Sequence, residues 1–197
     1  MPSRVPVQVL SGNCPIDDLP DLLDLSELAE GMERLWMKSV ARLDEGIVAE
    51  YAATLVKQAD GSLKLINEIS GDSTNVVPDW ATTEPGTFIG TFQTHPRTDE
   101  FLPMPFSDTD FVSAIQLREK LSLLYSDDVV CALVRTAATV DYINIYEIKN
   151  EFLSFVMTPD MEARFLPNAV WAANKWLARK YGFGLYMGTP NELFREV

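Results

Sequence analysis

The chain has 197 residues, of which 47% are hydrophobic and 23% are charged, an ordinary composition for a folded domain. Its formal net charge of −13 argues against non-specific nucleic-acid binding, which depends on Lys and Arg. No apolar run approaches the roughly 18 residues of a membrane span, and the N-terminal sequence MPSRVPVQVLSGN lacks the apolar centre of a signal peptide. We therefore expect a cytoplasmic protein that binds neither nucleic acid nor membrane.

The first half of the chain predicts one helix followed by a hairpin. Residues 1–20 contain several prolines and are expected to form an irregular arm. Apolar residues at helical spacing predict a helix from Ser26 to Leu43, with Ser26 as its N-cap. Alternating apolar residues predict a strand over 47–55, and Asp60-Gly61 predicts a turn into a returning strand over 63–69.

The second half adds strands and helices in alternation. The pattern predicts a strand over 87–92, a helix over 108–125, strands over 129–136 and 141–148, and a helix over 161–181 with Pro167 in its first turn or breaking it. This order predicts a mixed α/β (α+β) fold with a mostly antiparallel sheet flanked by helices. We expect a single domain over 1–197.

A possible metal site surrounds the only histidine of the chain, His95. Alternate side chains of a strand share a face, so Gln93 and His95 are expected to face a common point. Asp110 in the following helix could supply a third ligand, which is the number that a zinc hydrolase requires. Such an enzyme also needs a base beside the metal, and Glu45 and Glu50 are the two candidates.

Each of these residues also has a purely structural interpretation. Ser107 and Asp108 are plain helix N-cap candidates, and Asp110 in a first helical turn suits the helix dipole. Glu45 could be a solvated residue between a helix and a strand. Cys131 lies in the apolar run VVCALV and is interpreted as a small buried residue, with a Cys131–His95 nucleophile pair as the alternative.

Taken together, the order of these pieces resembles the JAB/MPN family, whose catalytic members carry the JAMM zinc motif. That motif is a glutamate after a first helix, then His-x-His-Pro at a strand end, then Ser-x-x-Asp opening a helix. Glu45, His95 and the pair Ser107 and Asp110 match it, whereas Gln93 replaces the first histidine. The match spans about residues 26–148, and the remainder, about 160–197, is expected to be a helical extension.

The resemblance implies a three-layer, cytidine-deaminase-like arrangement and a zinc-dependent metallopeptidase, isopeptidase or deubiquitinase activity. It implies that Gln93, His95 and Asp110 hold zinc, that Glu45 activates the zinc-bound water, and that Ser107 stabilises the oxyanion. The implied substrate is a ubiquitin-like protein conjugate or a peptide. Because a glutamine amide is a poor zinc ligand, we expect zinc to bind weakly or not at all. The alternative is a non-catalytic JAB/MPN-like binding or scaffold domain that acts with a protein partner or as a homodimer.

Overall fold

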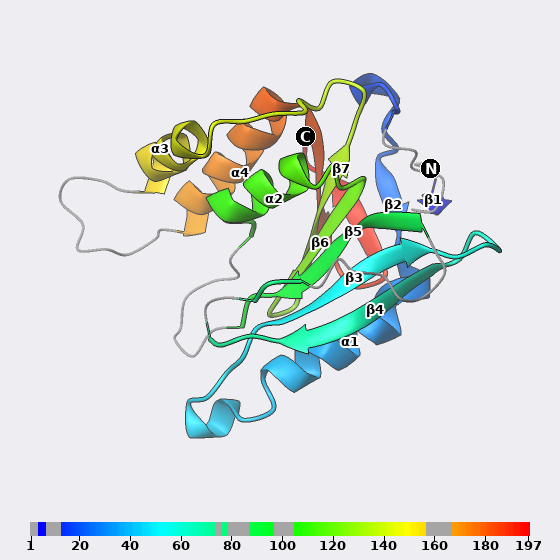
Figure 1. The fold of residues 1–197 in the computed structure, drawn as a ribbon, viewed down its shortest axis with the longest axis vertical. Coiled ribbons are helices and arrows are strands. Elements are labelled where there is room, and N and C mark those ends of the chain that lie inside the picture. The colour runs from blue at the N-terminus through cyan, green and yellow to red at the C-terminus, as the bar shows by residue number, and fades with distance from the viewer. Residues whose placement is uncertain (1–3, 7–12, 74–75, 79–86, 97–104, 157–166) are drawn as a thin grey trace.

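The computed structural model describes residues 4–6, 13–73, 76–78, 87–96, 105–156 and 167–197 (Figure 1). Within these ranges nine strands form one sheet in the order β1-β2-β9-β8-β7-β6-β5-β3-β4. The strands are β1 (Arg4–Pro6), β2 (Leu22–Asp24), β3 (Tyr51–Lys57), β4 (Leu63–Ser70), β5 (Thr87–Thr94), β6 (Leu121–Ser126), β7 (Val129–Arg135), β8 (Phe183–Gly188) and β9 (Glu192–Arg195). Among the described strands only β1–β2 and β5–β6 pair in parallel, so the expectation of a mostly antiparallel sheet is confirmed.

Helices cover both faces of this sheet. They are α1 (Ser26–Ser39), α2 (Asp108–Gln116), α3 (Ile145–Val156) and α4 (Pro167–Tyr181), with short 3-10 turns at Ile16–Asp18 and Leu43–Glu45. α1 packs on one face, whereas α2, α3 and α4 pack on the other (Figure 1). Residues of β7 divide accordingly: Val130 and Ala132 belong to the core under α1, and Cys131 and Leu133 belong to the core under the other three helices. The result is three layers, helix on sheet on helix.

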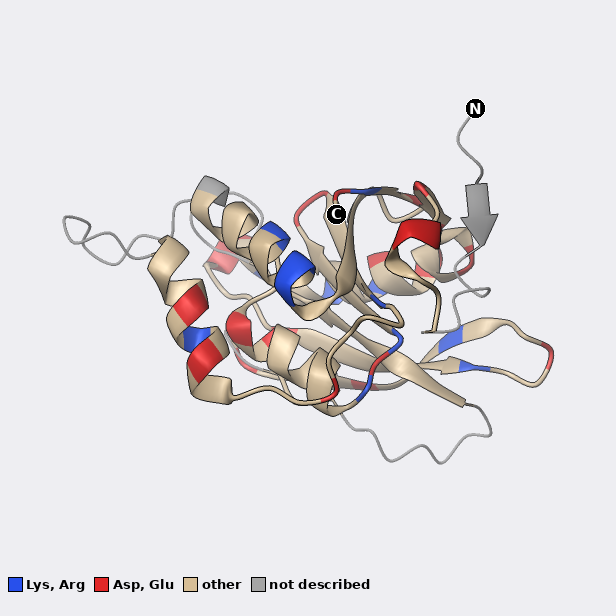
Figure 2. Cartoon of the chain, turned by 90° about the horizontal axis from the view of Figure 1, so that it is seen from above, with Lys and Arg blue, Asp and Glu red and all other residues tan. Residues whose placement is uncertain are grey.

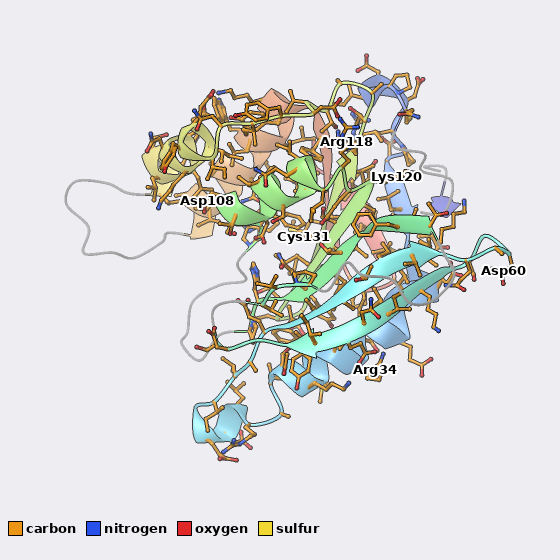
Figure 3. The ribbon with its side chains drawn as sticks, viewed as in Figure 1. Arg34, Asp60, Asp108, Arg118, Lys120 and Cys131 are labelled. Atoms are coloured by element: carbon orange, nitrogen blue, oxygen red, sulfur yellow. The ribbon has the colours of Figure 1, made fainter. Side chains whose placement is uncertain are left out.

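The elements of the first half lie close to where the sequence places them. α1 ends at Ser39, four residues before the expected end, and Leu25 occupies its N-cap position in place of Ser26. The Ser26 N–H instead donates a hydrogen bond to the side-chain carboxylate of Asp24, at 3.0 Å. The hairpin turn at Asp60-Gly61 is confirmed, since Gly61 has a φ of 91° and Asp60 lies at the hairpin tip (Figure 3).

Two predictions for the second half are wrong. The helix expected over 108–125 ends at Gln116, and its second part is the strand β6. All six residues of β6 are buried, because both faces of this central strand are covered, so its sequence shows no alternation. The segment 141–148, expected as a strand, instead leads into α3, an amphipathic helix that buries Ile148, Phe152 and Val156.

Residues 160–166 of the expected helical extension lie outside the described residues, and within 167–197 the extension is only partly helical. Pro167 is the first residue of α4, where its missing N–H costs no hydrogen bond. After α4 the chain forms β8 and β9, which join the sheet, and β9 pairs with β2 near the N-terminus. Within the arm expected to be irregular over residues 1–20, β1 also joins the sheet by pairing with β2.

α3 and α4 lie side by side and are complementary in charge. Acidic residues lie on α3 and basic residues on the neighbouring α4 (Figure 2), and Lys180 pairs with Glu147 at 3.1 Å and with Glu151. Glu151 also accepts a hydrogen bond from the Tyr181 hydroxyl at 3.1 Å. None of the helices within the described ranges has the length and apolar character needed to cross a membrane.

Candidate functional site

The candidate site lies where the end of β5 meets the beginning of α2, and Asp110 is at its centre. One oxygen of Asp110, Oδ1, accepts a hydrogen bond from the Gln93 side-chain amide. The other, Oδ2, accepts from the Ser107 backbone N–H at 2.6 Å and from the Ser107 hydroxyl at 2.7 Å. His95 completes the group, with its Nε2 lying 3.9 Å from Oδ2. The structure therefore brings together four of the predicted site residues.

Local sequence places Ser107 and Asp110. Ser107 is the N-cap of α2, its hydroxyl accepts from the Asp110 N–H at 3.4 Å, and the two residues form a reciprocal capping box. Acidic residues in the first turn, Asp108 among them, suit the positive end of the helix dipole (Figure 3). The structural interpretation of both residues is thus confirmed, and the same geometry directs the Asp110 carboxylate toward β5.

β5 places the other two side chains. Gln93 and His95 are two residues apart at its C-terminal end, and both contact Asp110. The His95 backbone is fixed by β6, because its N–H donates to the Tyr125 carbonyl at 2.9 Å and its carbonyl accepts from the Ser126 hydroxyl at 3.0 Å. The His95 and Asp110 side chains each retain 13% of their exposure. The site is consequently a partly buried group at one end of the sheet.

The two candidate bases have very different surroundings. Glu45 ends the 3-10 turn Leu43–Glu45, its side chain is 57% exposed, and it forms an ion pair with Arg42 at 2.6 Å. The structure does not bring Glu45 to the group around Asp110. Glu50 directly precedes β3 and is only 9% exposed. Burial, with the nearby charges of Asp110 and Asp72, raises the pKa of Glu50 to about 7. Of the two, Glu50 is the acid that lies within electrostatic reach of the site.

The residues present do not complete a zinc site. His95 and Asp110 offer a nitrogen and an oxygen at a separation close to the roughly 3.4 Å expected of two ligands on one tetrahedral zinc ion. Gln93 occupies the third position, but a carboxylate oxygen accepts hydrogen bonds, so the amide must turn its N–H toward Asp110. An N–H group cannot bind a metal. Within the described part of the chain, no three His, Cys, Asp or Glu side chains are arranged to hold a metal ion.

A second buried acid beside the site was not singled out in the sequence. Glu119 follows α2, is 1% exposed, and accepts hydrogen bonds from the Ser122 and Thr91 hydroxyls, the latter at 3.1 Å. Burial raises its pKa to about 7, although the two hydroxyl contacts act in the opposite direction. Glu119 lies in the charged run REK, which is typical of a solvated surface, so the sequence gives no signal of its burial.

Cys131 is a buried residue in the core beneath α2, α3 and α4, as its apolar surroundings predict. Burial raises the pKa of its thiol above the ordinary value, which disfavours the thiolate that a nucleophile requires. The structural interpretation of Cys131 is therefore confirmed.

Comparisons with models of known protein families, with curated proteins and with solved structures find no match to this chain. The resemblance to the JAB/MPN family thus depends on the motif residues and their order alone.

Proposed function

We propose that this chain carries the site of a JAMM-type zinc metallopeptidase or isopeptidase in which Gln93 impairs zinc binding. The observation that supports this proposal is the convergence of Gln93, His95, Ser107 and Asp110, four positions of one motif, at the meeting of β5 and α2. The substrate class, a peptide or the isopeptide bond of a ubiquitin-like conjugate, follows from the resemblance. No catalytic step is assigned to zinc in the chain as it stands.

The chain's own residues offer a proton-transfer group at this site. Glu50 has a pKa of about 7, so near neutral pH it can both take up and release a proton. The Ser107 hydroxyl and the N-terminus of α2 lie close by and favour negative charge. These features fit hydrolysis of a carbonyl compound, which needs a base and a stabilised oxyanion.

Restoring the missing ligand tests the proposal. The Gln93→His variant is expected to bind one zinc ion tightly per chain, whereas the parent binds zinc weakly or not at all, because an imidazole replaces an N–H donor at the third position. Zinc content after dialysis and zinc affinity by competition with a chelator measure the difference. Gln93→Asn serves as the control, since it changes the side chain without adding a ligand of this strength. The proposal fails if Gln93→His binds no more zinc than the parent.

The identity of the base is tested in the Gln93→His background. Glu50→Gln is expected to lower kcat by roughly 10²- to 10⁴-fold, the usual contribution of a general base. Glu45→Gln is expected to leave kcat within about twofold, because Glu45 is exposed and paired with Arg42. The assay is cleavage of a ubiquitin-like isopeptide conjugate and of a peptide extension. A large loss with Glu45→Gln and none with Glu50→Gln would reverse the assignment.

A second candidate function is a non-catalytic JAB/MPN-like binding or scaffold domain. The Gln93–Asp110 hydrogen bond favours it, because the carboxylate is satisfied by protein donors without a metal. The segment leading into α3 also exposes large apolar side chains, with Tyr142 at 81%, Ile145 at 49% and Tyr146 at 77%. Sedimentation analysis and affinity capture test this candidate. A chain that stays monomeric and captures no partner would count against it.

A further inference from the structure

Gln93 has a role that extends beyond the loss of a ligand. We infer that its amide takes the structural place of the metal ion, by linking β5 to the N-terminus of α2 through Asp110. In a metal site, ligands from the strand and from the helix are held together by the ion they share. Here the Gln93 N–H group on β5 donates directly to Asp110 on α2. The metal half of this inference depends on the proposed function, whereas the link itself depends only on the observed contacts.

Both oxygens of the Asp110 carboxylate accept hydrogen bonds from the protein. Oδ1 is bound by the Gln93 amide, and Oδ2 is bound by the backbone N–H and the hydroxyl of Ser107. Hydrogen bonds to a carboxylate are stronger than those between neutral groups, and Asp110 retains only 13% of its exposure. Loss of the Gln93 donor would leave Oδ1 without that partner in a partly buried place. A cation at Oδ1 would compete with this hydrogen bond for the charge of the carboxylate.

The link lies at one end of α2, and a second polar link holds the other end. The Arg135 guanidinium on β7 donates to the Ile115 carbonyl at 3.0 Å and to the Glu119 carbonyl at 3.3 Å. α2 is therefore tied to the sheet by side chains at both ends. The N-terminal link is the one that a metal ion would provide in a complete site.

The test is thermal unfolding of the full chain, first with EDTA and then with zinc. Gln93→Glu keeps the shape of the side chain but replaces the donor with a second carboxylate. In EDTA at pH 8 its Tm is expected to fall by about 3 to 10 °C, since a hydrogen bond to a charged group is lost and like charges face each other. The Tm of Gln93→Ala is expected to fall by a similar amount. Gln116→Glu is the matched control, because it adds the same charge on the exposed face of α2, and its Tm is expected to change little.

Zinc then separates the two variants. It is expected to restore the Tm of Gln93→Glu, in which two carboxylates and His95 form three ligands, and to leave the parent and Gln93→Ala unchanged. The link is overturned if both variants have the parent Tm in EDTA, whatever zinc does. The replacement of a metal is overturned if zinc stabilises the parent as much as Gln93→Glu. If the Tm of Gln93→Glu and of Gln93→Ala falls in EDTA but Gln93→His takes up no zinc, the link stands and the proposed function fails.

Discussion

A Gly90→Ala variant is expected to lose its cooperative unfolding transition, or to lose more than about 4 kcal/mol in its free energy of unfolding. A Cβ at Gly90 would lie 1.9 Å from the Leu121 carbonyl oxygen and 2.9 Å from its carbon. Both atoms belong to the backbone at the start of β6, so no side-chain rotation removes the overlap. The strands must separate by more than an ångström, although packed interiors tolerate little such movement.

The distortion would reach the site, because Gln93 lies three residues further along β5 and His95 directly follows the last residue of this strand. A displaced β5 would move both side chains relative to Asp110, which is fixed to α2. Urea unfolding followed by circular dichroism measures the loss. Gly31→Ala is the control, since the nearest atom to its Cβ is the end of the flexible Leu65 side chain, at 3.3 Å, and alanine favours the helix. A Gly90→Ala midpoint equal to that of the parent would show that β5 and β6 can adjust.

The parts of the site that could be predicted from sequence are those with local rules. A Ser-x-x-Asp before an apolar run predicts an N-cap and a first helical turn, and both form at Ser107 and Asp110, where the two residues make a reciprocal capping box. Alternation along a strand specifies that Gln93 and His95 share a face, and both contact Asp110. The two rules lead to one site because the end of β5, with Gln93 and His95, meets the start of α2, with Ser107 and Asp110.

The choice between the two acids could not be made in this way. Glu45 and Glu50 lie on the same short connection, and the decision depends on where the 3-10 turn ends and β3 begins. Gly46, with a φ of 72°, ends the turn and leaves Glu45 beside Arg42 at the surface. Boundaries of this kind are the least predictable feature of a sequence, because one or two residues reverse which side chains are buried.

Tertiary burial accounts for the elements that the sequence misplaces. The apolar residues Leu117, Leu121 and Leu124 have helical spacing, yet Arg118 has a φ of 54° and ends the helix region. β6 is then covered by helices on both faces, which removes the alternation that marks a strand. The same long-range coverage hides Glu119, whose partners come from two other positions on β5 and β6.

The burial of Glu119 predicts that the free energy of unfolding decreases as the pH rises from about 4.5 to about 7. In the unfolded chain this carboxyl has its ordinary pKa of 4.5, and in the folded protein burial raises the pKa to about 7. Between these values the folded protein holds a proton that the unfolded chain has released, so a higher pH favours unfolding. At about 1.4 kcal/mol for each pH unit of the interval, the full effect is roughly 3 kcal/mol above pH 7.

Glu119→Gln is expected to remove this part of the pH dependence. The free energy of unfolding of the variant should approach that of the parent as the pH falls below 4.5, where Glu119 becomes neutral in the unfolded chain as well, and exceed it by up to about 3 kcal/mol at pH 8. Urea unfolding of both proteins at several values between pH 4.5 and pH 8 gives the difference, in which the titration of all other groups cancels. Glu50 has a pKa raised in the same direction, so the variant keeps a smaller decrease that Glu50→Gln should reduce.

The groups around Glu119 determine whether its pKa is raised, as this prediction requires, or lowered. Burial favours the protonated form, and the Asp110 charge acts in the same direction, whereas the Ser122 and Thr91 hydroxyls favour the carboxylate. The Arg135 guanidinium contacts the Glu119 backbone carbonyl at 3.3 Å. Glu45→Gln is the control, because Glu45 is exposed and Arg42 lowers its pKa, which is the opposite of the direction in Glu119. Parallel profiles for the parent and Glu119→Gln would mean that the two hydroxyls outweigh burial and hold Glu119 ionised in the folded protein.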